Sequence, residues 1–136
     1  MASGIYDCFK VDLMDGSVDL ASGGDTIKVG LYDDSHAFTA SDTAYTTTNE
    51  LATTGGYTRD GKDLSGGDVA MASNTATWDA TDVSWTSASF TVYHAVLYSE
   101  TNSDSLICSI DFGGAQTVTS GTFTIEWNAS GIITLS

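Results

Sequence analysis

Short runs of alternating apolar and polar residues, separated by glycine-containing turns, constrain this 136-residue chain more than any other feature. The clearest runs are residues 25–32, 90–99 and 122–127, and such alternation is typical of strands with one buried face. Shorter runs lie at 62–64, 69–72, 75–78, 83–85, 106–112, 117–119 and 132–135. The chain has 14 glycines and no proline, so the turns depend on glycine and asparagine. The pattern predicts an all-β fold, either an antiparallel β-sandwich or a jelly-roll.

One helix is expected before the strands. Ile5, Phe9 and Leu13 recur every four residues within residues 4–14, Ser3 is a candidate N-cap, and Gly16 lies just past the end. No repeat, linker or change in composition divides the chain. Its length fits one domain, so we predict a single β-sandwich domain over residues 1–136 with a helix at about 4–14.

Residues 33–61 form a long polar stretch with few apolar anchors. Segments of this kind are usually surface excursions, and such excursions often make contacts with other molecules. The stretch is therefore our first candidate for a partner interface, and the expected helix is the second. An alternative for both is packing on their own domain. The candidate interface residues are Phe38, Tyr45, Leu51 and Tyr57 in the stretch, with Ile5 and Phe9 in the helix.

The charge balance is strongly acidic and limits the class of partner. The chain has 18 Asp and Glu against 4 Lys and Arg, for a formal net charge of -14. Such a chain repels phosphate backbones and anionic lipid headgroups, so we expect neither nucleic acid nor a membrane as a partner. No apolar run approaches the length of a membrane span, and no signal-peptide pattern opens the sequence.

Residues with catalytic or metal-binding chemistry are few, and we expect no enzyme activity, metal or cofactor. Cys8 and Cys108 lack the close spacing of zinc ligands, and two buried thiols are favoured over a disulfide or a site shared with the two histidines. Asp79 and Asp82 flank tryptophans, as in a carbohydrate cleft, but a strand pair with core tryptophans gives the same string. Trp85, Phe123 and Trp127 are expected in the core.

Several segments together resemble a family of small virion proteins of tailed bacteriophages. They are DTIKVGLYD at 25–33, GGYTRDGKDLSG at 55–66, WDATDVSWTSASFTVYHAVLY at 78–98, and LICSIDFGGAQTVTSGTFTIEWNASGIITLS at 106–136. The order of these segments carries the resemblance, which extends from the expected helix to the end of the chain. It implies a structural protein of the virion and no catalytic residues.

Resemblance and charge together favour a capsid decoration (cement) protein. An anionic protein on the outer face of the head avoids the repulsion of packaged DNA. The expected partners are the major capsid protein and further copies of the chain, as a dimer or trimer. The protein would be made in the host cytoplasm and reside on the virion. An alternative is a tail, neck or fibre component that binds host glycans on aromatic side chains. A small polysaccharide hydrolase is a third, weaker hypothesis.

Overall fold

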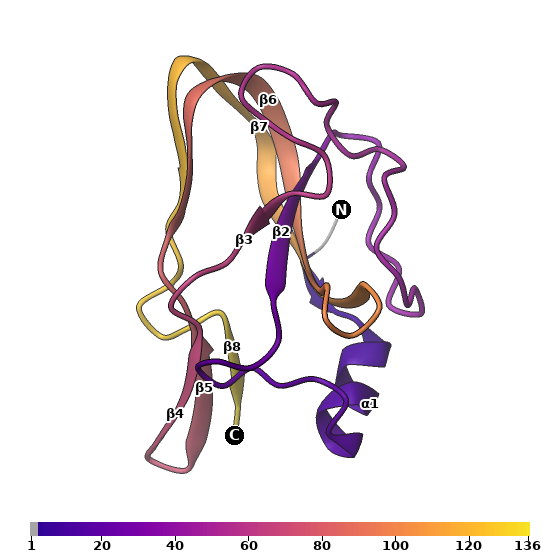
Figure 1. Ribbon diagram of the computed structural model, residues 1–136, viewed down its shortest axis with the longest axis vertical. Helices are drawn as coiled ribbons and strands as arrows, with labels where there is room; N and C mark the ends of the chain where they lie inside the picture. Colours follow the sequence, from indigo (N-terminus) through magenta and orange to yellow (C-terminus); the bar gives the residue numbers. More distant parts are fainter. Residues whose placement is uncertain (1–2) are drawn as a thin grey trace.

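The computed structural model describes residues 3–136 as two antiparallel sheets and one short helix (Figure 1). The elements in chain order are β1 (Gly4–Ile5), α1 (Asp7–Asp15), β2 (Ile27–Tyr32), β3 (Lys62–Asp63), β4 (Asp68–Ala72), β5 (Thr75–Asp79), β6 (Val83–Ser99), β7 (Ser105–Ile125) and β8 (Ile133–Leu135). The larger sheet has the order β1-β7-β6-β2-β3, and the smaller sheet has the order β4-β5-β8. The prediction of an all-β, sandwich-like fold with a short N-terminal helix is confirmed.

A long two-stranded ribbon of β6 and β7 forms the frame of the molecule. The two strands pair antiparallel from Val83–Ile125 to Ser99–Ser105, with four irregularities in register. Figure 1 shows the ribbon rising from the level of α1, bending over at one end of the molecule, and descending toward β5 and β8. Ser87 and Ser120, both with positive φ, lie where the pairing is irregular. Because bulges bend and twist strands, the ribbon can curve over while both of its strands stay paired in the larger sheet.

The larger sheet is buried on both faces around β2 and β6. Val29, Leu31 and Leu97 belong to the main core on one face. Tyr32 and Tyr98 belong to a second apolar cluster on the other face, and Phe38 and Tyr45 are among the residues that pack on it; we call this the tyrosine cluster. The start of the 33–61 segment thus covers the sheet as a second layer. This double burial explains why β2 and the end of β6 read as nearly continuous apolar runs.

The helix begins later than predicted. We expected it at 4–14, but Gly4 and Ile5 pair with Ser109 and Cys108 of β7, and α1 begins at Asp7. Pairing at the sheet edge satisfies backbone groups that an isolated first turn would leave unbonded, so strand addition prevails there. Ser3 is not the N-cap, because its hydroxyl accepts a hydrogen bond from the amide of Asp111. The predicted end is confirmed, since Gly16 closes the helix with a φ of 80°.

Two predicted turns are wrong. Gly113–Gly114 and Ser120–Gly121 were expected to separate strands, but both lie inside β7. Gly113, Gly114 and Ser120 have φ values of 80°, 148° and 48°, which suit bulges as well as turns. The runs expected at 106–112, 117–119 and 122–127 therefore form a single bent strand, and 83–85 and 90–99 likewise merge into β6. The strands expected near 62, 69, 75 and 132 are present as β3, β4, β5 and β8.

Candidate functional site: an apolar groove beside the small sheet

One face of the small sheet is entirely apolar. The antiparallel register places Val69 opposite Trp78 and Trp78 opposite Ile133 in one row across β4, β5 and β8. A second row on the same face consists of Met71, Ala76 and Leu135. Because side chains alternate between faces, residues two apart on each strand share this surface. A sheet face of this composition is normally covered by another layer.

The helix covers only part of this face. A hollow of about 190 Å³ remains between α1 and the small sheet, and we call it the apolar groove. Its lining residues are Phe9, Leu13, Asp19, Leu20, Ala21, Val69, Ala76, Thr77, Trp78, Ile133 and Leu135. Phe9 is the one buried residue of α1, whereas Leu13 is 41% exposed. The end of the apolar groove near Phe9 is thus covered by α1, and the other end is open to solvent.

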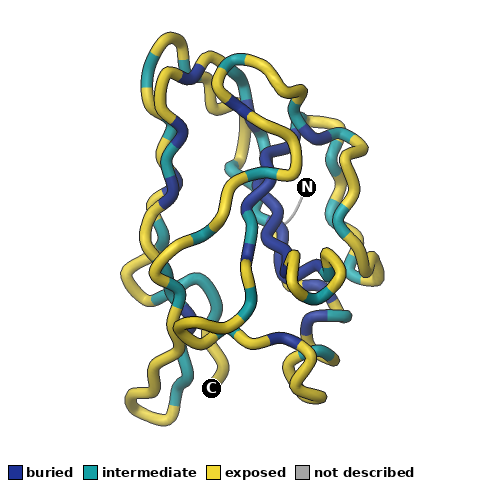
Figure 2. Tube along the Cα trace, viewed as in Figure 1, coloured by how far each residue is buried: buried dark blue, intermediate teal, exposed yellow. Residues whose placement is uncertain are grey.

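The open end exposes large apolar side chains. Val69 is 44% exposed, Leu135 is 62% exposed and Met71 is 83% exposed. Met14, at the end of α1, is also exposed. Figure 2 shows this end of the molecule, with the β4–β5 hairpin, the end of α1 and the chain's C-terminus, as largely solvent-facing. Single exposed apolar residues are ordinary, whereas several gathered on one sheet face are typical of interaction surfaces.

The one charged side chain that lines the apolar groove within the described chain is acidic, and it is Asp19. Asp15, at the end of α1, lies outside the lining, and Asp68 of β4 lies on the opposite face of the small sheet with Ala70 and Asp79. Hydrogen bonds from Ser17 hold the pKa of Asp15 below its ordinary value, so this exposed carboxyl is charged at neutral pH. Within residues 3–136, no lysine or arginine lines the apolar groove. Lys10, the one basic residue of α1, forms an ion pair of 3.0 Å with Asp7.

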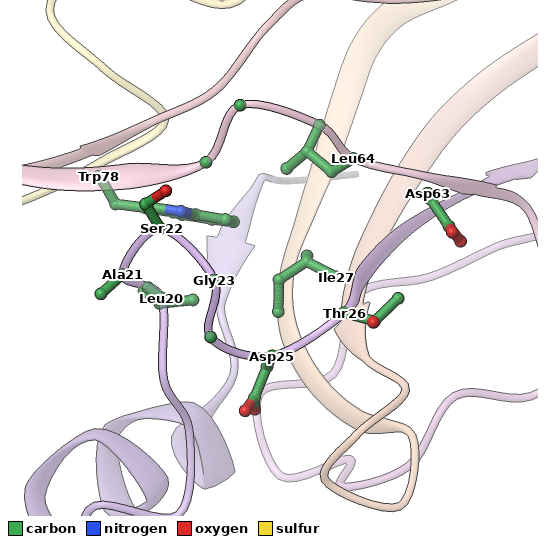
Figure 3. Close-up of a pocket in the computed structure, with 13 residues that line it drawn as sticks. Leu20, Ala21, Ser22, Gly23, Asp25, Thr26, Ile27, Asp63, Leu64 and Trp78 are labelled. Carbon is green, nitrogen blue, oxygen red and sulfur yellow. The ribbon is translucent and has the colours of Figure 1, made fainter.

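A second hollow lies beside the Trp78 indole (Figure 3). Its volume is about 250 Å³, and it shares Leu20, Ala21 and Trp78 with the apolar groove. Figure 3 shows the glycine-containing loop at residues 20–25 passing over one wall and the Asp25 carboxylate turned away from the indole. The Asp25 carboxylate accepts a hydrogen bond of 2.8 Å from the Ser99 hydroxyl, so it already has a partner within the fold. Both hollows are smaller than typical small-molecule sites of about 300–1,000 Å³.

The residues predicted for a partner interface pack mostly on their own chain. Phe9 and Tyr57 are buried in the main core, and Leu51 packs against it. Phe38 lies 4.9 Å from the Tyr6 ring, and Tyr45 stacks on Tyr98 at 3.8 Å between centroids. Ile5 is partly exposed. The structure therefore separates these residues between both faces of the larger sheet, and only Phe9 lines the apolar groove. Their contact with a partner stays a prediction.

Glu50 anchors the 33–61 segment through a buried polar cluster. Its Oε2 accepts hydrogen bonds from the Tyr57 hydroxyl (2.5 Å) and the Asp60 amide (2.8 Å). The Tyr57 hydroxyl also accepts a hydrogen bond of 2.9 Å from the Leu31 amide, and this bond connects the cluster to β2. Tyr45 points its hydroxyl toward this cluster, but no described residue offers it a hydrogen bond of good geometry. Burial, and then the nearby Tyr57 hydroxyl, raise the pKa of Tyr45.

The groups considered for catalysis or metal binding have structural roles. Asp82 accepts the Trp127 amide, and Asp79 accepts the amide of the next residue. Both cysteines are free thiols, and Cys108 is buried while Cys8 is half-buried. In the part of the chain that the structure describes, no three His, Cys, Asp or Glu side chains are grouped to hold a metal ion.

Trp78 is 3% exposed, so it offers no open ring face for stacking on a sugar. The aromatic argument for glycan binding therefore finds no support at this residue.

Comparisons with known proteins return no match. No model of a known protein family fits the chain, and no characterised protein or solved structure is similar to it. Among residues 3–136 no helix is long and apolar enough to cross a bilayer.

Sequence reasoning missed the apolar groove itself. The outward alternation of Val69 with Met71, and the terminal Ile133 and Leu135, was visible as strand pattern. What identifies these residues as a surface is the pairing of β5 with β8, which joins distant parts of the chain.

Proposed function

We propose that this chain is a bacteriophage capsid decoration (cement) protein that binds the outer face of the assembled head. It attaches to the major capsid protein through the apolar groove and bridges neighbouring capsomers without covalent bonds. The half-covered apolar sheet face on an otherwise anionic molecule is the observation that carries this proposal. The order of sequence segments typical of small phage virion proteins supports the location on a virion.

The physical effect of such binding is stabilisation of the assembled shell. A protein that binds the shell but not free subunits shifts the equilibrium toward the shell by mass action. Each contact need be only moderate, because many copies act together. The net charge of -14 favours the outer face, since packaged DNA inside the head would repel the protein.

The test uses purified heads that lack the protein, incubated with the wild-type chain or with Met71→Gln/Leu135→Gln. These two side chains are exposed, so their replacement leaves the core intact. We expect cryo-EM density for the wild-type chain on the outside of the head, and loss of most of that density for the variant. Density on the tail, no density on the particle, or full occupancy by the variant would refute the proposal.

Self-association belongs to the same proposal. Closed symmetric oligomers are the commonest state of soluble proteins, and capsid axes are themselves symmetric. We expect a dimer or trimer in analytical ultracentrifugation, either free or on the head. A chain that is monomeric in solution and in the reconstruction would remove oligomerisation from the proposal while leaving the shell-binding role intact.

A further inference from the structure

We propose that the apolar groove takes a segment of a partner protein that presents one or two large apolar side chains flanked by lysine or arginine. This inference rests on the proposed docking role of the groove and names the chemistry of what docks there. It concerns the partner's local sequence and is independent of which particle carries the partner.

The size of the groove points to side chains and not to a small-molecule ligand. Its volume of about 190 Å³ lies below the range of pockets that enclose whole ligands, about 300–1,000 Å³. A hollow of this size accepts an apolar anchor that projects from a protein surface. Its lining is almost entirely apolar, since Asp19 is its one charged residue within the described chain.

The exposed row of the small sheet extends the contact beyond the hollow. Met71 and Leu135 continue the lining outward from Val69, on the same sheet face. Met14 adds a second flexible thioether at the end of α1. Methionine side chains adapt their shape to a partner, which suits a surface that receives an anchor of variable form. An inserted anchor and its neighbours would bury these side chains together.

The charge of the lining favours a basic partner. Asp19 is the one charged residue of the lining, and no lysine or arginine among residues 3–136 lines the hollow. Lys10 is already paired with Asp7. A second copy docked here about a twofold axis would bring the two Asp19 carboxylates toward each other, at a net charge of -14 per chain. Lysine or arginine beside the anchor would instead pair with the Asp19 carboxylate, and the same attraction would raise the rate of association.

The experiment titrates isotope-labelled full-length protein with three capped ten-residue peptides and follows its amide signals by NMR. The first peptide has two leucines flanked by lysines, the second replaces the lysines by glutamates, and the third replaces the leucines by serines. We expect saturable shifts in β4, in β8 and at the end of α1 with the first peptide only. Equal binding of the second or third peptide, or shifts elsewhere, would overturn the inference, as would no binding at all.

Variants separate the two contributions. Met71→Gln/Leu135→Gln should weaken binding of the first peptide by about tenfold or more. Val11→Gln replaces an exposed apolar residue outside the lining and should leave the binding unchanged. Asp19→Asn should weaken binding of the first peptide by about three- to fivefold and flatten its salt dependence. Asparagine retains the acceptor oxygen that the Asp19 side chain offers to the Ala21 amide. The matched control, Asp33→Asn, makes the same change in net charge outside the lining, and the Asp33 side chain likewise accepts a backbone amide, that of Ser35.

The outcomes remain distinguishable from those of the head-binding test. If heads take up the wild-type chain but the peptides fail to discriminate, the decoration role stands and the basic partner is refuted. If the peptides discriminate and heads do not bind, the reverse holds. If signals of β4 and β8 shift with protein concentration alone, the groove receives a second copy, and the inference is overturned.

Discussion

At the scale of single residues, Trp85 is one of the two tryptophans buried in the main core. It is 4% exposed, and its ring centroid lies 5.9 Å from Phe123 and 6.4 Å from Tyr57. Trp85→Ala should lower the free energy of unfolding by about 3–5 kcal/mol, because the change removes buried area and leaves a cavity. Chemical denaturation followed by circular dichroism measures the loss.

Two further variants serve as references for the loss of stability expected for Trp85→Ala. Met71→Ala, at an exposed position, should change the free energy of unfolding by no more than about 0.5 kcal/mol. Trp127, expected in the core, is only half-buried and donates its indole N–H to the Thr81 carbonyl, so Trp127→Ala should cost less than Trp85→Ala. A Trp85 variant as stable as the Met71 variant would contradict the packing described.

Buried tyrosine hydroxyls and a buried thiol, with raised pKa values, make the stability of the fold decrease at alkaline pH. Burial raises the pKa of Tyr6 from 10.0 to about 12 and that of the Cys108 thiol from 9.0 to about 12. These groups bind their protons more tightly in the folded chain, so their contribution to stability is complete below the unfolded pKa and is lost as the pH rises toward the folded pKa. We expect the melting temperature to fall steadily between about pH 9 and 12.

The accompanying signal is the absorbance of tyrosinate. It should rise together with the loss of near-ultraviolet circular dichroism, because Tyr6 and its buried neighbours ionise only as the chain unfolds. Ionisation of all tyrosines near pH 10 with the near-ultraviolet signal preserved would show that these hydroxyls are accessible in the folded state.

At the scale of elements, the packing of the 33–61 segment on β2 depends on one glycine. A Cβ at Gly30 would overlap the Tyr45 hydroxyl, and the backbone of Gly30 is not in the left-handed region. Gly30→Ala should therefore destabilise the fold by about 1–3 kcal/mol through overpacking alone. The melting temperature and the near-ultraviolet circular dichroism of the tyrosine cluster measure the effect.

Tyr45→Phe provides the matched rescue. Its hydroxyl is buried without a good partner among the described residues, so removing it should change stability by less than about 1 kcal/mol. In the Gly30→Ala background the same change should restore about 1 kcal/mol, because it removes the atom that the new methyl group meets. Additive effects of the two substitutions would show that the segment is held by other contacts.

Local pattern was sufficient for the strands and insufficient for their boundaries. Alternation located β2, β4 and β5 within two residues. β2 and β5 are buried or half-buried, whereas β4 is exposed along its whole length. It failed at Gly113–Gly114 and at Gly4–Ile5, where tertiary pairing decides between a turn, a bulge and a strand. Packing of the 33–61 segment on its own domain was an alternative that local pattern could not decide, because one glutamate and a few tyrosines carry that packing. The apolar groove depends on sheet order, which no local window contains.

At the scale of the whole molecule, charge repulsion opposes the folded state. The 18 acidic residues face only 4 basic ones, and three ion pairs of the described chain use just two lysines, Lys10 and Lys28. Raising the ionic strength from about 0.01 M to 0.15 M shortens the screening length from about 30 Å to 8 Å. We expect the melting temperature to rise by about 2–6 °C in sodium chloride over this range.

Potassium chloride at the same ionic strength is the control, because screening does not depend on the identity of the cation. A melting temperature that falls with either salt would mean that the few ion pairs outweigh the general repulsion. A rise with only one of them would indicate a specific ion site.

The β6–β7 ribbon also has a consequence for how the chain reaches its fold in time. Its two strands are neighbours in sequence, so they can zip from the turn at residues 100–104 as an early, local event. Pairing of β2 with β6 and of β5 with β8 must close much longer loops, and this delays the small sheet until the final residues are in place. Refolding should therefore be slow for a chain of this size, on the order of milliseconds to seconds, with the small sheet and its apolar groove forming last.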